Sequence, residues 1–138
     1  MTAIVDTSVL VRYLTQSPPQ QALQAARLIE SDVKILVPTM VLGESAFALG
    51  HYYGLAREAI VNLLVDLLSR VNIDTLDVER GRAIEGLRMC RSSGRVSFGD
   101  ALIWAAARSR PARPVCTFDR RFPRAGLEVR FLDAGSGI

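Results

Sequence analysis

Short apolar runs that alternate with longer helical segments are the feature that most restricts how this chain can fold. Five runs are predicted to be strands, at residues 2–5, 35–37, 71–75, 115–117 and 129–132. Helical segments separate most of them, and this order is typical of βαβ units with a mainly parallel sheet. The sequence therefore predicts an α/β fold.

Apolar spacing and residues that start or stop helices define the helical segments. Pro18 and Pro19 suit the first turn of a helix. Thr39 and Asp77 are expected to cap two further helices, and Ser92-Ser93-Gly94 ends the one that Asp77 begins. We expect helices at residues 8–15, 18–30, 39–53, 55–70, 77–91 and 97–110.

Length and composition indicate one globular domain. The chain has 138 residues, of which 49% are hydrophobic and 22% are charged, and this suffices for one core. We expect a single domain over residues 1–134 and a flexible tail over residues 135–138.

A cytoplasmic location is the expectation from the same data. Asp6 interrupts the first apolar run, so no signal peptide is expected, and no stretch suits a membrane span. Cys90 and Cys116 are interpreted as small buried hydrophobes in a reducing compartment, because two such cysteines form no disulfide framework or zinc spacing.

Four carboxylates fall just beyond predicted strands or near the starts of helices. Asp6 ends the first apolar run, Glu44 lies seven residues after the second, Asp100 opens an apolar helix, and Asp119 follows the run at 115–117. In an open parallel sheet these places form one crevice. Acids gathered there repel each other, and a hard divalent cation such as Mg²⁺ or Mn²⁺ relieves the repulsion. The pattern predicts a metal site that acts on phosphate.

Each acid also has a purely structural interpretation. Asp6 is a plausible helix cap, and Ser97 with Asp100 fits a capping box. Glu44, on an apolar helix, would need an Arg partner if it were not functional. Asp119 would be a turn residue paired with the arginines that follow it. The joint placement of all four favours the metal site.

The charge balance suits a polyanionic partner. The net charge is +3, but four of the 14 acidic residues belong to the candidate site, which leaves ten against 17 basic residues. A basic surface of this kind favours nucleic acid, although it also occurs in merely soluble proteins.

The segment at 39–53 is apolar around nearly its whole circumference. Such a helix lies inside a domain or at an interface. A homodimer face that includes Tyr52 and Tyr53 is one interpretation, and plain core packing is the other.

Four motifs contain the four acids. They are Ile4-Val5-Asp6-Thr7-Ser8-Val9-Leu10, Pro38-Thr39-Met40-Val41-Leu42-Gly43-Glu44, Ser97-Phe98-Gly99-Asp100-Ala101-Leu102-Ile103 and Cys116-Thr117-Phe118-Asp119-Arg120-Arg121-Phe122. Together they resemble the PIN-domain ribonucleases, and specifically the VapC toxins of bacterial toxin–antitoxin pairs. The resemblance covers nearly the whole chain, in order, and departs at none of the acidic positions.

The resemblance implies a three-layer α/β/α sandwich and an Mg²⁺-dependent endoribonuclease, with Mn²⁺ as a possible substitute. Asp6, Asp100 and Asp119 would be metal ligands, and Glu44 would orient and deprotonate the attacking water. It also implies an RNA substrate and a cognate VapB-type antitoxin, which would cover the acidic pocket with an arginine-bearing segment.

Secondary candidates surround these acids. Thr7 and Thr117 are candidates for hydrogen bonds to a carboxylate or phosphate, or are simply strand-end residues. His51 is interpreted as a helix-end or interface residue, and Trp104 as core. The basic candidates for RNA contact, against solvated surface, are Arg120, Arg121 and Arg124, followed by Arg88, Arg91 and Arg95.

Several other functions are disfavoured or left as alternatives. No Gly-rich phosphate loop is present, and Lys34, the only lysine, does not suit a receiver domain. The alternatives to a toxin ribonuclease are a PIN nuclease of RNA maturation and a non-catalytic binding module. An adjacent antitoxin reading frame would distinguish the toxin from the maturation nuclease. A non-catalytic binding module would be expected to have lost at least one of the four acids.

Overall fold

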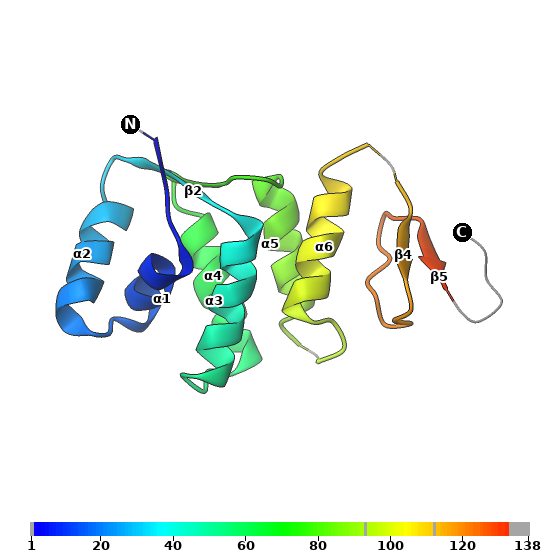
Figure 1. Cartoon of the computed structure of the whole chain (residues 1–138), viewed down its shortest axis with the longest axis horizontal. Helices are drawn as coiled ribbons and strands as arrows, with labels where there is room; N and C mark the ends of the chain where they lie inside the picture. Colours follow the sequence, from blue (N-terminus) through cyan, green and yellow to red (C-terminus); the bar gives the residue numbers. More distant parts are fainter. Residues whose placement is uncertain (1, 93, 112, 133–138) are drawn as a thin grey trace.

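The helices occur in the expected order (Figure 1). The computed structural model describes residues 2–92, 94–111 and 113–132. Each helix in this part of the chain overlaps a segment that was expected to be helical. They are α1 (Thr7–Thr15), α2 (Pro19–Ile29), α3 (Thr39–His51), α4 (Arg57–Leu68), α5 (Arg80–Met89) and α6 (Phe98–Arg108).

Three strands form a parallel sheet at the centre of the N-terminal part. They are β1 (Thr2–Ile4), β2 (Lys34–Val37) and β3 (Ile73–Thr75), in the order β1-β2-β3. Ile4 lies opposite Leu36 in the register of β1 and β2. Because both strand pairs are parallel, the chain leaves all three strands at the same edge of the sheet. The expected α/β fold with parallel strands is confirmed.

Two further strands form a second, separate parallel sheet. These are β4 (Val115–Thr117) and β5 (Val129–Phe131), which pair only with each other in the described structure. In Figure 1 this pair lies at the end of the long axis opposite α1 and α2. The strands were predicted correctly, but the single sheet assumed for the acidic crevice is found as two sheets.

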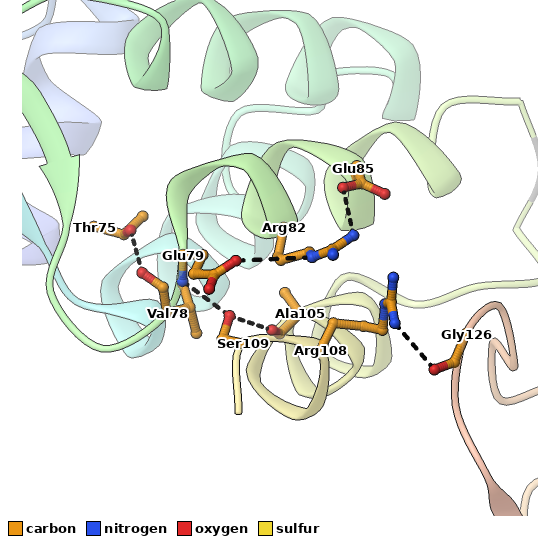
Figure 2. Close-up of polar contacts among 9 residues, drawn as sticks. All are labelled: Thr75, Val78, Glu79, Arg82, Glu85, Ala105, Arg108, Ser109 and Gly126. Atoms are coloured by element: carbon orange, nitrogen blue, oxygen red, sulfur yellow. Dashed lines mark hydrogen bonds and ion pairs between the residues drawn. The ribbon is translucent and has the colours of Figure 1, made fainter. Parts of the chain in front are cut away.

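Contacts with α6 hold the second sheet in its place. Trp104 is 1% exposed and packs with Ala105 and Phe122, and its Nε1 donates a hydrogen bond to the carbonyl oxygen of Ala125 at 2.8 Å. Arg108 Nη1 donates to the carbonyl oxygen of Gly126 at 3.1 Å (Figure 2). Gly126 has φ +71°, a backbone conformation in which a residue with a side chain would be strained. The prediction that Trp104 is a core residue is confirmed.

Helix α3 has one buried and one exposed side. Val41, Leu42 and Leu49 are buried in the main core, whereas Met40 and Phe47 are exposed. Core packing therefore accounts for part of its apolar circumference, and an apolar outer surface remains.

Two of the expected helix caps are wrong. Thr39 is the first residue of α3 instead of its cap, and its backbone N–H and hydroxyl both donate to Asp77 Oδ1, at 2.9 and 2.6 Å. Asp77 thus serves the start of α3, and α5 begins later, after Glu79. The backbone N–H of Glu79 donates to Ser109 Oγ at 2.9 Å, which ties α5 to the end of α6 (Figure 2).

The cysteine prediction is half right. Cys90 is buried, and this burial raises the pKa of its thiol to about 11. Cys116 is exposed, because it belongs to the thin second sheet instead of a central one.

Two remaining expectations concern the membrane and the tail. Within the ranges given above, the structure contains no helix with the length and apolar character of a membrane span. The predicted tail at 135–138 and its boundary at 134 lie outside the described residues.

A close approach between α5 and α6 at Gly86 generates a stability prediction. A Cβ on Gly86 would lie 2.7 Å from the carbonyl oxygen of Ala101, so Gly86→Ala must push two backbones apart. We expect it to lower the free energy of unfolding in urea by about 1–3 kcal/mol. Gly81→Ala, also in α5 but with nothing within 4 Å of its Cβ, is the control and should leave stability unchanged or slightly higher. Equal stability of the two variants would contradict the packing described.

Candidate functional site

Asp6 lies directly beyond the main sheet, at the N-terminus of α1. Its Oδ1 accepts hydrogen bonds from Ser8 Oγ at 2.6 Å and from the backbone N–H of Val9 at 3.2 Å. Asp6 is therefore a helix cap, as its structural interpretation stated. The bond from Ser8, followed by that from Val9, lowers the pKa of the carboxyl. The capping role thus also keeps the side chain ionised and exposed at this edge of the sheet.

Glu44 comes to the same place from a different helix. Helix α3 begins just after β2 and packs against α1. Thr7 Oγ1 donates a hydrogen bond to Glu44 Oε1 at 2.9 Å across 37 positions of sequence. None of the ion pairs between described residues includes Glu44, so the arginine partner of its structural interpretation is not found. The Thr7 hydroxyl thus fixes the Glu44 carboxylate next to Thr7, the residue that follows Asp6 in the chain.

Asp100 lies in the first turn of α6. Its backbone N–H donates to Ser97 Oγ at 3.0 Å, so the predicted cap at Ser97 is present. Helix α6 packs against α3 at this end, since a Cβ on Gly43 would lie 3.5 Å from Leu102 Cδ1. Gly43 precedes Glu44 directly, and Leu102 is two residues after Asp100. The backbone segments that carry these two acids are therefore neighbours.

Asp119 lies apart from this group. It follows β4 in the second sheet, and its Oδ1 accepts hydrogen bonds from the backbone N–H of Arg121 at 2.8 Å and from Arg121 Nε at 3.4 Å. The backbone bond is the main reason that the pKa of Asp119 is lowered. Its geometry is that of a turn residue paired with a following arginine, which was its structural interpretation.

The four acids are thus not assembled as one cluster. Among the side chains that the structure describes, no group of three or more His, Cys, Asp or Glu residues is arranged to hold a metal ion. The expected common crevice requires all strands to share one sheet edge, and β4 pairs with β5 alone. Glu44 is bonded to Thr7, the neighbour of Asp6; Asp100 is on α6, which packs against α3; and Asp119 follows a strand of the second sheet.

The secondary candidates have defined contacts. Thr117 Oγ1 accepts from the backbone N–H of Asp119, as a strand-end residue would. Arg120 and Arg124 both lie over the ring of Phe131, at 4.7 and 5.4 Å from its centroid. His51 is the last residue of α3, which confirms the helix-end interpretation.

Ser8 is a site residue that the sequence interpretation did not single out. Its hydroxyl is the strongest influence on the Asp6 carboxylate. The signal was present in the sequence Asp6-Thr7-Ser8, where two hydroxyl residues follow an acid at a helix start.

The donor set fits a hard divalent cation. Asp6 and Glu44 present exposed carboxylate oxygens, Asp100 lies on the adjoining helix, and none of the three forms an ion pair with a described cationic side chain. Oxygen ligands of this type suit Mg²⁺ and Mn²⁺. Asp6, Glu44 and Asp100 are the residues that would hold such an ion by the chemistry of their oxygens, although in the described part of the chain they are not gathered into a metal-binding cluster.

A comparison with protein families identifies the family of this chain. Residues 3–127 match the PIN domain. The chain belongs to the PIN domain family. PIN domains are generally nucleases, typically dependent on a divalent metal, and the motifs that carry Asp6, Glu44, Asp100 and Asp119 all lie inside the matched region. No curated protein and no solved structure matches the chain significantly.

The Ser8 hydrogen bond generates a prediction about Asp6. In Ser8→Ala the pKa of the Asp6 carboxyl should rise toward its ordinary value, because its main stabilising hydrogen bond is lost. The ionised form would then be lost at a higher pH than in the wild type as the solution is acidified. Carboxyl ¹³C NMR titration measures this shift, and Ser8→Thr, which keeps a hydroxyl, is the control. An unchanged titration in Ser8→Ala would show that the bond is absent in solution.

Proposed function

We propose that this PIN domain is an Mg²⁺-dependent endoribonuclease that acts as the toxin of a toxin–antitoxin pair. The hydrogen bond from Thr7 to Glu44 carries the proposal, because it unites acids from the starts of two helices at one edge of the main sheet. PIN nucleases bind RNA, and the ten acidic residues outside the four candidates face 17 basic ones. A polyanionic substrate fits that balance.

The proposed roles follow from the contacts of each acid. Asp6, kept ionised by Ser8, and Asp100 would be the principal ligands of Mg²⁺, or of Mn²⁺ in its place. The bound ion would lower the pKa of a water molecule and neutralise charge on the scissile phosphate. Asp119 would be an outer acid that completes the site.

Glu44 would position and deprotonate the attacking water. Thr7 occupies one oxygen of the Glu44 carboxylate, which leaves Oε2 to accept the proton from the water. The oxygen of that water then forms the new bond to phosphorus as the bond to the leaving oxygen breaks. A carboxylate fixed by a neighbouring hydroxyl loses little freedom in this step.

The toxin role implies an antitoxin of the VapB type. An arginine-bearing segment of such a partner would neutralise Asp6 and Glu44, whose carboxylates have no ion pair within the described chain. The alternative is a PIN nuclease of RNA maturation with the same site. An antitoxin reading frame next to the gene would favour the toxin role over the role in RNA maturation.

A homodimer is also part of the proposal. Its expected face is the apolar outer side of the segment at 39–53, where Met40 and Tyr53 are exposed, since contiguous apolar surface favours self-association.

The activity is tested by metal-dependent cleavage. Purified protein, freed of antitoxin and metal, should cut total RNA into discrete fragments as Mg²⁺ is added. Asp100→Asn should lower the rate at least about a hundredfold, because a ligand charge is lost. Circular dichroism verifies that the variant is folded. Cleavage at equal rates by both proteins would indicate a contaminating nuclease, and no cleavage with either metal would contradict the proposal.

The separation of Asp119 from the other acids predicts unequal effects. Asp6→Asn should impair cleavage as strongly as Asp100→Asn. Asp119→Asn should cost about tenfold or less, because Asp119 follows a strand of the second sheet and its carboxylate pairs with Arg121. Initial rates on one fragment-mapped RNA measure the difference. Losses of equal size for Asp6→Asn and Asp119→Asn would place β4 beside β1 in the active molecule.

A further inference from the structure

Three aromatic rings form an ordered cluster at the end of α3. The rings of Phe47 and His51 are stacked, with centroids 5.0 Å apart and an interplanar angle of 19°. Tyr52 packs edge-on against both, at 6.2 Å from Phe47 and 4.8 Å from His51. Phe47 is 60% and Tyr52 is 73% exposed. Exposed rings that already hold one another in place lose little conformational freedom when a ligand binds.

A groove connects this cluster to the candidate catalytic acid. Its volume is about 490 Å³, which is in the range of small-molecule sites. We call it the aromatic groove, and it is lined by Thr7, Gly43, Glu44, Phe47, Ala48 and Tyr52. Thr7 and Glu44 are the two residues joined by the hydrogen bond in the acidic site. The groove and that site are therefore continuous.

We propose that the aromatic groove binds the nucleobase of a nucleotide next to the scissile phosphate. This inference rests on the proposed ribonuclease function. Bases stack on exposed aromatic side chains in proteins that bind single-stranded RNA. Gly43 and Ala48 present almost no side chain, so a flat ring has room beside Phe47 and Tyr52.

A cationic side chain also adjoins the acids. Arg12 Nη1 donates to the carbonyl oxygen of Ser8, whose hydroxyl in turn bonds Asp6. Arg12 is thus near Asp6, and the aromatic groove is lined by Glu44. A strand with its scissile phosphate at Asp6 and Glu44 would place a further phosphate toward Arg12 and a base in the groove. An apolar helix of a protein partner would instead meet the Glu44 carboxylate with no charge to match it.

Binding of short RNA to a cleavage-deficient protein tests the groove. The background is Glu44→Gln, which keeps an oxygen to accept the Thr7 hydrogen bond. The probes are a fluorescent hexamer of 2′-O-methyladenosine and a hexamer of the same backbone that lacks bases. We expect Phe47→Leu and Tyr52→Leu to raise the Kd of the base-containing hexamer about tenfold, as loss of one stacked base would, and to leave the abasic hexamer unaffected.

Tyr53→Leu is the matched control. Tyr53 is an exposed neighbour of Tyr52, at 47%, and does not line the groove. It should change neither Kd. Because Phe47 and Tyr52 are exposed, leucine should leave the thermal unfolding midpoint unchanged, and this is measured for each variant.

Several outcomes would overturn the inference. They are unchanged binding in Phe47→Leu and Tyr52→Leu, an equal loss with both hexamers, and an equal loss in Tyr53→Leu. A shift from dimer to monomer in sedimentation of Tyr52→Leu would assign the groove to a second copy of the chain. If the wild type cleaves RNA but the bases make no difference to binding, only the groove fails. If the bases matter but no metal supports cleavage, only the ribonuclease proposal fails.

Discussion

Parallel pairing of β1 with β2 determines where the acids of this PIN domain lie. With Ile4 opposite Leu36, the chain leaves both strands at one edge, where α1 and α3 begin. Asp6 then caps α1, and Glu44 lies in the second turn of α3. The 2.9 Å hydrogen bond from Thr7 to Glu44 joins the two helices. An antiparallel pair would send one of these helix starts to the opposite edge. The site therefore depends on the parallel direction of β1 and β2.

The proposed cation site consists of carboxylates that form no ion pair with a described side chain. Hydrogen bonds from Ser8 and Val9 lower the pKa of Asp6, and the hydroxyl of Thr7 orients Glu44. Neutral donors order these carboxylates, and neither carboxylate forms an ion pair with a described side chain. A divalent ion would bind to such carboxylates, activate a water molecule and offset the charge of a phosphate. The aromatic groove, which Glu44 also lines, would add an apolar surface for the base of the nucleotide next to that phosphate.

Local signals predicted more of this molecule than long-range ones. The strands, the helices, the cap at Ser97 and the burial of Trp104 follow from a few neighbouring residues, and the structure has them all. Thr39 and Asp77 were assigned as separate caps because their hydrogen bond spans 38 positions. The exposure of Cys116 and the surroundings of Asp119 were not predicted, because both depend on which strand lies next to β4. A sequence pattern carries no information about that choice when every strand is short and apolar.

The measurement that tests this account most directly is the location of bound Mn²⁺ by paramagnetic broadening in NMR spectra of the ¹⁵N-labelled protein, whose mass of 15.1 kDa suits the method. The account predicts that signals from residues around Asp6, Glu44 and Asp100 broaden at the lowest Mn²⁺ concentrations. It also predicts that Asp6→Asn removes this effect and that signals around Asp119 broaden later. Uniform broadening, or first broadening at a site remote from α1 and α3, would contradict the central claim that the acids at this sheet edge hold the metal.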